Sequence, residues 1–297
     1  MAATSTRRKI RIQADDGVEL TATWFTQAPG SAVDLSVLIC PATGVPQHYY
    51  RHLAEYLQSQ GCEVLTWDWS GIAESASVPP HKLSFRAWGQ RDLVAVLDWA
   101  ERHLSGPLSA VGHSAGGQVL GLARNNHKLP AMLTVASQHG YWRHWAPVYQ
   151  PMMLGIWYGA VPMATRLFKQ VPGALIGGDG LPAPIAADWG RCCRSPHYFA
   201  DERGEPLHQG FHEWRGSLRM ITVSDDPLYG PPAGVRALGA LYRNASVEHI
   251  ELCPDDWQLK RIGHFGFFRR SMPQAAWRQA LDWLHSQVQH PHSRAVA

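Results

Sequence analysis

The chain has 297 residues, of which 45% are hydrophobic and only 17% are charged. At about 150 residues per domain, this length fits one large folded unit or two smaller ones, with ample apolar material for a core, and it excludes disordered, collagen-like and membrane-bundle proteins. The 27 Lys and Arg residues against 24 Asp and Glu residues give a net charge of +3, too small a surplus to indicate a nucleic-acid partner.

The first half of the chain alternates strand and helix patterns. Alternating polar and apolar residues at 7–14 and 18–25 flank Asp15-Asp16-Gly17 and predict a β-hairpin. Apolar runs that are typical of strands buried on both faces follow at 35–40, 63–67, 108–112 and 131–136. Helical patterns cover 49–57 and 85–100. This alternation predicts an α/β fold with a parallel sheet covered by helices on both faces.

Residues 138–215 interrupt the alternation. They are rich in Pro, Gly and aromatic residues, and five of the 13 Trp residues lie there. Regular patterns then return as a strand at 218–223, a helix at 232–241, a strand at 247–252 and a last helix around 277–288. We therefore predict a core domain made of 1–137 and 216–297, with a cap, or lid, inserted at 138–215.

Gly112-His113-Ser114-Ala115-Gly116 is a GxSxG motif between an apolar strand and a helical run at 118–124. In this context the serine lies on a tight strand-to-helix turn, and the small residues around it permit close backbone contacts. The motif predicts that Ser114 is a catalytic nucleophile. The alternative is a glycine-lined turn in which Ser114 only caps the helix.

A serine hydroxyl needs a base and an orienting acid, which follow it in the order acid, then histidine in this kind of fold. The strand at 218–223 ends in Ser224-Asp225-Asp226-Pro227, and we prefer Asp226 as the acid, with Asp225 as the alternative. His264 lies between two glycines after the last strand. The predicted catalytic residues are therefore Ser114, Asp226 and His264.

The chain holds 16 histidines, so the others need an interpretation too. His113 should point away from Ser114 and pack under the turn. His139 and His144 stand at the entry to the cap, where a structural role is favoured over substrate contact. His48 and His52 share a helix face, but the Glu of an HExxH motif is missing, so no zinc site is predicted.

A tetrahedral intermediate needs two backbone N–H donors, one of them from the residue after the nucleophile, here Ala115. The second should come from the loop after the third strand. Thr43 is the preferred donor because Pro41 has no N–H and Gly44 permits the turn, and Ala42 is the alternative.

Together these motifs resemble the α/β-hydrolase superfamily, and within it the branch of serine aminopeptidase-like and monoglyceride-lipase-like enzymes. Residues 67–75 resemble that branch's Asp-x-x-Gly-x-Gly-x-Ser segment, with Ala73 in place of the second Gly, while Pro41-Ala42 replaces its His-Gly. Residues 40–47, 68–71 and 263–268 look like a bacterial subgroup of predicted hydrolases. The resemblance implies an eight-stranded, mostly parallel sheet with the cap inserted after the sixth strand.

We expect a serine esterase in which Ser114 attacks the ester carbonyl, His264 is the base, Asp226 orients it and water resolves the acyl-enzyme. A thioesterase or acyltransferase with the same triad is the alternative, and a non-catalytic ligand-binding homologue is a further one. The substrate would be a small ester or thioester with an apolar or aromatic group. Aromatic side chains of the cap either line its pocket or pack the cap onto the core: Trp142, Trp145, Trp157, Tyr158 and Trp189.

The remaining features concern cofactors and location. The five cysteines form no CxxC pair, so we expect neither a disulfide framework nor a metal, and no cofactor. The N-terminal residues lack the apolar stretch of a secretory signal, which favours the cytoplasm. Residues 145–165 carry no charge, but three prolines argue against a membrane-spanning helix and for a lid or pocket wall, with peripheral lipid contact as the alternative. A homodimer is left open.

Overall fold

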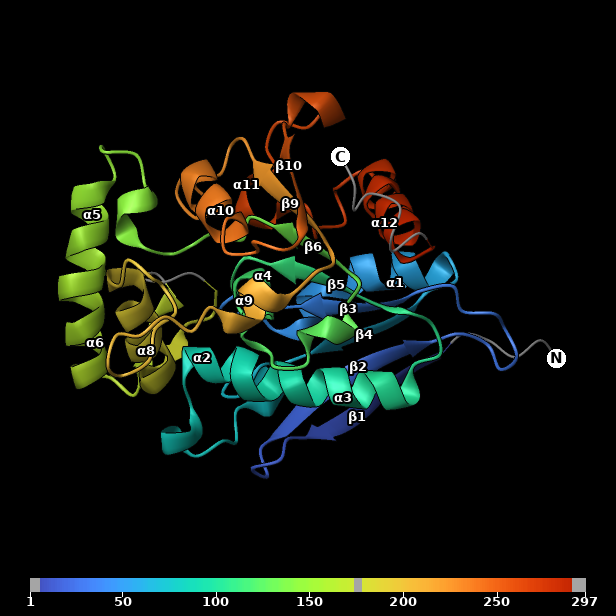
Figure 1. Ribbon diagram of the computed structural model, residues 1–297, viewed down its shortest axis with the longest axis horizontal. Coiled ribbons are helices and arrows are strands. Elements are labelled where there is room, and N and C mark those ends of the chain that lie inside the picture. The colour runs from blue at the N-terminus through green and yellow to red at the C-terminus, as the bar shows by residue number, and fades with distance from the viewer. Residues whose placement is uncertain (1–5, 174–177, 290–297) are drawn as a thin grey trace.

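The computed structural model describes residues 6–173 and 178–289 (Figure 1). The predicted ranges 1–137, 138–215 and 216–297 also include 1–5, 174–177 and 290–297, which lie outside the described residues. Within the described part of the chain, none of the helices combines the length and the apolar character needed to cross a membrane.

The core is an eight-stranded sheet with the order β1-β2-β4-β3-β5-β6-β9-β10 among the described residues. Its strands are β1 (Thr6–Gln13), β2 (Glu19–Thr26), β3 (Ser36–Cys40), β4 (Glu63–Trp67), β5 (Leu108–His113), β6 (Ala131–Val135), β9 (Ser217–Val223) and β10 (Ser246–Leu252). The β1–β2 and β2–β4 pairs are antiparallel, and the other pairs are parallel. The predicted α/β fold with a mostly parallel sheet is confirmed.

Both faces of the sheet bury apolar side chains. Successive side chains of a strand point to opposite faces, and in the central strands both sets are mostly apolar. Val37 and Val111 contribute to one core layer, and Leu38 and Ala110 contribute to the other. Helices α1 (Arg51–Ser59) and α12 (Gln274–Gln289) cover the first face, whereas α3 (Val94–His103) and α10 (Pro232–Gly239) cover the second (Figure 1). Helix α2 (Phe85–Ala87) continues through the π-helical turn η4 (Trp88–Leu93) into α3.

The prediction of a helix at 118–124 is wrong in its bounds. Helix α4 spans only Ala115–Gln118, and a separate 3-10 turn follows at Leu120–Leu122. Glycine lowers helix propensity, and Gly121 has no room for a side chain because a Cβ there would lie 2.3 Å from the ring of Phe211. Phe211 belongs to α9 (Gln209–Glu213), so a contact from a distant segment decides where the helix ends.

Residues 138–215 contain several helices that the sequence did not reveal. Helix α5 (Gln150–Leu154), the π-helical turn η8 (Gly155–Ala160) and α6 (Val161–Leu167) follow one another directly. The short strands β7 (Gln170–Val171) and β8 (Leu181–Pro182) then pair, and α8 (Ala183–Arg194) follows. Helix α8 contacts both α6 and α2, and α5 and α6 lie outermost, at the left of Figure 1.

A buried ion pair joins residues 138–215 to helix α2 beside the sheet. Arg86 of α2 contacts Asp188 of α8 at 2.9 Å, and the backbone N–H of Arg86 also donates to this carboxylate at 3.0 Å. Phe85 and Trp189 pack beside the pair, with 5.8 Å between their ring centroids. The remaining short helices are Gln47–Tyr50, Ala73–Ser75, Pro80–Lys82, Asn126–Lys128, Trp142–His144, Asp255–Trp257 and α11 (Gly263–Gly266).

Candidate active site

Ser114 lies on the sharp turn between β5 and α4. Its backbone has φ 50° and ψ −117°, a conformation that is costly for a residue with a side chain. The backbone N–H of Ser114 donates to the carbonyl of Val135 on the neighbouring strand at 2.9 Å, which holds the turn to the sheet. Only 7% of the residue is exposed. The strand–turn–helix context that the GxSxG motif predicts is therefore present.

The turn is possible because three glycines surround it without side chains. A Cβ on Gly112 would lie 2.5 Å from the Cα of Gly117, and one on Gly116 would lie 2.1 Å from the carbonyl oxygen of Cys40. A Cβ on Gly117 would lie 2.2 Å from Oγ of Ser137. Backbone segments thus pack directly against each other around Ser114, as the glycine spacing predicts.

Asp226 and His264 form a buried pair. Asp226 follows β9, His264 lies in α11, and Nδ1 of His264 is 2.6 Å from Oδ2 of Asp226. Because Nδ1 donates its proton to the carboxylate, the neutral ring carries no proton on Nε2 and can act as a base there. The ring of His264 also lies 5.0 Å from the ring of His113, the residue before Ser114.

Asp225 makes different hydrogen bonds from Asp226. Its two carboxylate oxygens accept hydrogen bonds from the backbone N–H groups of Ile262, at 3.1 Å, and Gly263, at 2.8 Å. Gly263 has a φ of 59°, which favours glycine. Asp225 therefore holds the segment that carries His264, and the structure brings Asp226 rather than Asp225 to the histidine ring.

The loop after β3 is held at three points. The indole N–H of Trp69 donates to the carbonyl of Pro41 at 2.8 Å, and the backbone N–H of Ala42 donates to Oη of Tyr50 at 2.8 Å. Further along, a carboxylate oxygen of Asp68 accepts from the backbone N–H of Gln47 at 2.7 Å. The amide of Ala42, the alternative oxyanion donor, is already engaged.

The two preferred oxyanion donors have no other acceptor in the described part of the chain. Among the described residues, the backbone N–H groups of Thr43 and Ala115 donate to no other atom. The side-chain hydroxyl of Thr43 is buried and likewise has no partner in the described part of the chain. The segment that follows β7 contacts this loop, because the backbone N–H of Asp179 donates to the carbonyl of Gly44 at 3.0 Å.

A buried hydrogen-bonded chain links this loop to the histidine. Oη of Tyr50, which accepts from Ala42, lies 2.8 Å from Nδ1 of His113, and Nε2 of His113 lies 2.9 Å from the carbonyl oxygen of His264. Burial lowers the pKa of His113 far below its usual value. A neutral ring fits the chain, since Tyr50 donates to Nδ1 and Nε2–H donates to His264.

Sequence reasoning expected His113 only to pack under the turn and assigned no polar role to Tyr50. The ring of His113 does pack there, 4.5 Å from the ring of Phe268. The sequence feature that could have indicated a polar role for Tyr50 is the pair Tyr49-Tyr50, which follows the loop after the third strand. Tyr49 contributes as well, because its hydroxyl donates to the carbonyl of Phe265 at 2.9 Å.

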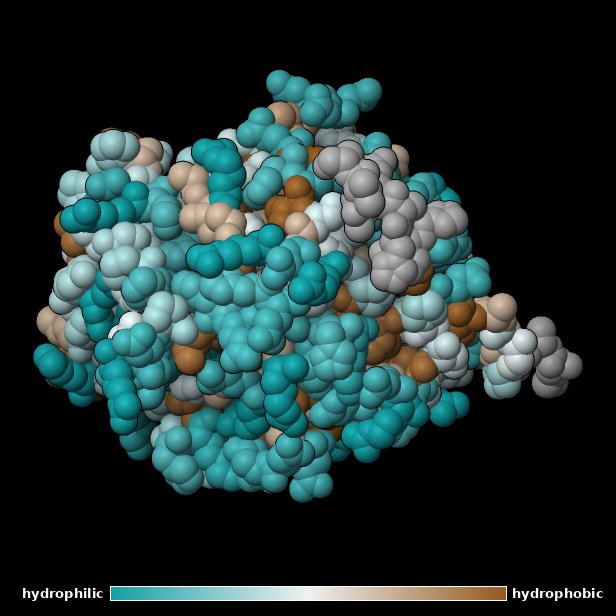
Figure 2. Space-filling view, viewed as in Figure 1, coloured by the Kyte–Doolittle hydropathy of each residue, from teal (hydrophilic) through white to brown (hydrophobic). Residues whose placement is uncertain are grey.

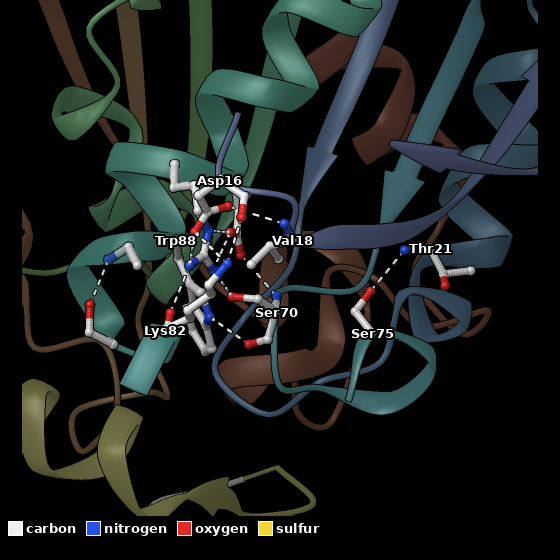
Figure 3. Close-up of polar contacts among 11 residues, drawn as sticks. Asp16, Val18, Thr21, Ser70, Ser75, Lys82 and Trp88 are labelled. Carbon is white, nitrogen blue, oxygen red and sulfur yellow. Dashed lines mark hydrogen bonds and ion pairs between the residues drawn. The ribbon is translucent and has the colours of Figure 1, made fainter. Parts of the chain in front are cut away.

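The segment 67–75 that resembles a family motif is held by hydrogen bonds around Ser70 (Figure 3). The backbone N–H of Ser70 donates to Asp92 at 2.9 Å, and Arg91 donates to Oγ of Ser70 at 2.6 Å. The indole N–H of Trp88 donates to the carbonyl of Ser70 at 3.1 Å. Trp88 also stacks on Trp69, at 5.5 Å between centroids, and so steadies the indole that binds Pro41.

The aromatic residues predicted for the pocket divide into two groups. Trp145, Trp157 and Trp189 are buried, and Trp157 and Trp189 pack edge to face with 5.0 Å between their centroids. Trp142 is half-buried beneath Arg143, and Tyr158 is 54% exposed on the outside of the cap. Trp145 and Trp189 contact residues outside 138–215, namely Leu228 and Phe85, and Trp157 packs against Trp189.

A polar contact between residues 138–215 and helix α4 was not predicted from the sequence. The hydroxyl of Tyr198 donates to Gln118 of α4 at 2.6 Å, and the indole N–H of Trp189 donates to Tyr198 at 3.1 Å. Gln118 in turn donates to Gln138 at 2.8 Å. His139 packs against the ring of Tyr198, and burial lowers its pKa to about 3. This cluster begins one helical turn after Ser114.

The described residues contain no cluster of three or more His, Cys, Asp or Glu side chains that could hold a metal ion. His48 lies in the 3-10 helix before α1, and His52 lies in α1 itself.

A cavity of about 600 Å³ lies between residues 121–130 and 207–216, and none of Ser114, Asp226 and His264 lines it.

The sheet order and the turn at Ser114 define an α/β-hydrolase fold. Residues 31–178 match the family described as serine aminopeptidase, S33, so the predicted resemblance to that branch is confirmed. No curated protein has a significantly similar sequence. The bacterial subgroup stays a prediction.

Solved structures share the fold at low sequence identity. The α/β hydrolase GrgF from Penicillium sp. sh18 has a TM-score of 0.63 and 14% identity, with 96% of this chain and 99% of that chain covered. The esterase Pf2001 from Pyrococcus furiosus has a TM-score of 0.59 and 13% identity, over 96% and 92% of the two chains. Est1E from Butyrivibrio proteoclasticus has a TM-score of 0.57 and 14% identity, over 95% and 99%.

Proposed function

We propose that this protein is a serine hydrolase that cleaves carboxylic esters through an acyl-enzyme. The observation that carries the proposal is the 2.6 Å hydrogen bond between Asp226 and Nδ1 of His264, beside the strained turn that presents Ser114. The match to a family of serine hydrolases and the esterases among the solved structures with this fold support it.

In the proposed reaction, Oγ of Ser114 attacks the ester carbonyl while Nε2 of His264 takes the hydroxyl proton. Asp226 keeps the ring in this tautomer and stabilises the imidazolium that forms. The ring then gives its proton to the leaving alcohol as the carbon–oxygen bond breaks. Water attacks the acyl-enzyme with His264 again as the base, which releases the acid and restores Ser114.

The negative charge of each tetrahedral intermediate would be met by the N–H groups of Thr43 and Ala115. Donors that are already oriented cost no reorganisation when charge develops, and one such donor is worth about 10²–10³ in rate. The contacts of Pro41 with Trp69 and of Ala42 with Tyr50 support such preorganisation, because they fix the backbone just before Thr43. The free hydroxyl of Thr43 is suited to act as a third donor.

An apolar or aromatic group on the substrate is favoured by the composition of the cap. Ring stacking and burial of apolar area are the main contributions that Trp side chains offer to a ligand. Est1E, which shares the fold, has been solved with bound ferulic acid, an aromatic acid. Trp142, half-buried at the start of the cap, is the preferred contact of the five predicted residues.

The test is hydrolysis of p-nitrophenyl esters of increasing acyl length, together with labelling by a fluorophosphonate. We expect Ser114→Ala to abolish both while the melting temperature stays near that of the wild type, and the exposed Ser286→Ala on α12 to change neither. Labelling that persists without Ser114 would overturn the assignment. Adding a competing alcohol, amine or thiol distinguishes hydrolysis from the acyltransferase alternative by its products.

A further inference from the structure

The outer helix of the cap exposes an unusual share of the protein's hydrophobic side chains. Of the eight large hydrophobic residues that are exposed in the described part of the chain, six lie between 152 and 168, with exposed fractions from 37% to 68%. We call these six the cap face: Met152, Leu154, Tyr158, Met163, Leu167 and Phe168. Clustered exposure of this kind marks an interaction surface, whereas single exposed residues do not.

The cap face is the outward side of an amphipathic rod. Met153, Trp157, Val161 and Ala164 of the same helical stretch are buried against the rest of the cap, so the exposed residues point the other way. The rod lies outermost in Figure 1, and Figure 2 shows a few hydrophobic residues at this left edge, with others near the centre and right of the view. An apolar face on the outside of a helix is typical of helices that lie on a membrane surface.

The charged residues within the rod and directly beside it in the sequence all have one sign. No Asp or Glu occurs between Glu101 and Asp179, a stretch that contains the whole rod. Arg143, Arg166 and Lys169 flank the face and are exposed, and none of them forms an ion pair with a described residue. Unpaired cations beside an apolar surface attract anionic headgroups.

We propose that the cap face docks on a lipid surface that contains anionic headgroups. The apolar side chains would enter the boundary between headgroups and acyl chains, while Arg143, Arg166 and Lys169 contact the headgroups. A second copy of the chain is a poorer occupant, because the face holds no carboxylate and two copies would bring like charges together. The docking involves none of Ser114, Asp226 and His264, so it can be tested independently of the proposed esterase activity.

The experiment is sedimentation of the full chain with vesicles of phosphatidylcholine alone and of phosphatidylcholine mixed with phosphatidylglycerol. We expect binding to the mixed vesicles and its loss at high salt, since surface charges are screened. Arg166→Gln and Lys169→Gln should each lower the partition coefficient roughly fivefold. The double variant Met163→Glu, Leu167→Glu should abolish binding, and Ser114→Ala should bind like the wild type.

The matched control is Gln274→Glu with Gln279→Glu, which adds the same charge on exposed positions of α12, far from the cap (Figure 1). It should bind nearly as well as the wild type, and thermal melts show whether each variant is folded. Three results would overturn the proposal: no binding to mixed vesicles, binding that the folded cap-face variants retain, or a dimer in analytical ultracentrifugation that these variants dissociate.

Discussion

Tyr50→Phe tests whether the hydrogen-bonded chain beneath the serine turn organises the site. The substitution removes one oxygen and leaves the ring in place, so packing against Phe268 is kept. It deprives the buried N–H of Ala42 of its acceptor and Nδ1 of His113 of its donor. An unsatisfied buried group costs about 1–3 kcal/mol, so the two together should lower the free energy of unfolding by about 2–6 kcal/mol.

For a domain of this size, each kcal/mol corresponds to roughly 2–4 °C, so we expect the melting temperature to fall by roughly 4–24 °C. Activity should fall too, because Ala42 precedes Thr43 in the loop that would bind the oxyanion. We expect kcat to decrease about tenfold or more with little change in KM, since the oxyanion forms only after binding. Calorimetry and ester kinetics at saturating substrate measure the two effects.

Tyr56→Phe is the matched control. Tyr56 is a buried tyrosine of the neighbouring helix α1, and its hydroxyl has no hydrogen-bond partner among the described residues. Its loss should change stability by less than about 0.5 kcal/mol. If Tyr50→Phe melts and turns over substrate like Tyr56→Phe, the reasoning about this chain is wrong.

Three further predictions concern the same site. Asp226→Asn should lower kcat by about 10⁴, whereas Asp225→Asn should mainly lower the melting temperature; equal kinetic effects would contradict the division of roles. Thr43→Val removes a buried hydroxyl that has no partner among the described residues, so the free energy of unfolding should stay the same or rise. The kcat for ester substrates should fall about tenfold, and an unchanged kcat would show that this hydroxyl is not a third oxyanion donor. Burial lowers the pKa values of His113 and His139 and keeps both rings neutral in the folded protein. As the pH falls below about 6.5, these residues gain protons in the unfolded chain but not in the folded one, so the free energy of unfolding should fall by roughly 1.4 kcal/mol for each histidine between about pH 7.5 and 5.5. Denaturant titrations measure this change; a free energy that does not vary with pH, or a pH dependence that His139→Gln leaves unchanged, contradicts the reasoning.

The strands and the serine turn could be predicted from the sequence because their causes are local. A run such as 35–40 is apolar at every position except Ser36, since both faces of that strand are buried, and the structure places β3 at Ser36–Cys40. Gly112, Gly116 and Gly117 stand where no Cβ fits, so their spacing around Ser114 already carried the geometry of the turn. The order of the predicted acid and base along the chain was likewise visible.

What the sequence left open depended on contacts between distant residues. Asp225 and Asp226 are chemically alike and adjacent, and only the path of the chain to residue 264 separates the carboxylate that binds the ring from the one that binds the backbone. Helix α4 ends early because Phe211 packs against Gly121. Neither contact leaves a periodic pattern in the sequence.

By itself, therefore, the sequence determined the α/β architecture, the serine turn and the candidate residues for chemistry, since hydrophobic periodicity and glycine spacing act over a few residues. Only the tertiary structure decided that Tyr50 and His113 connect the loop after β3 to His264, and that the helical stretch at 150–167 turns hydrophobic side chains outward. Those features depend on hydrogen bonds and packing between segments far apart in the chain, whose partners are chosen by the complete fold.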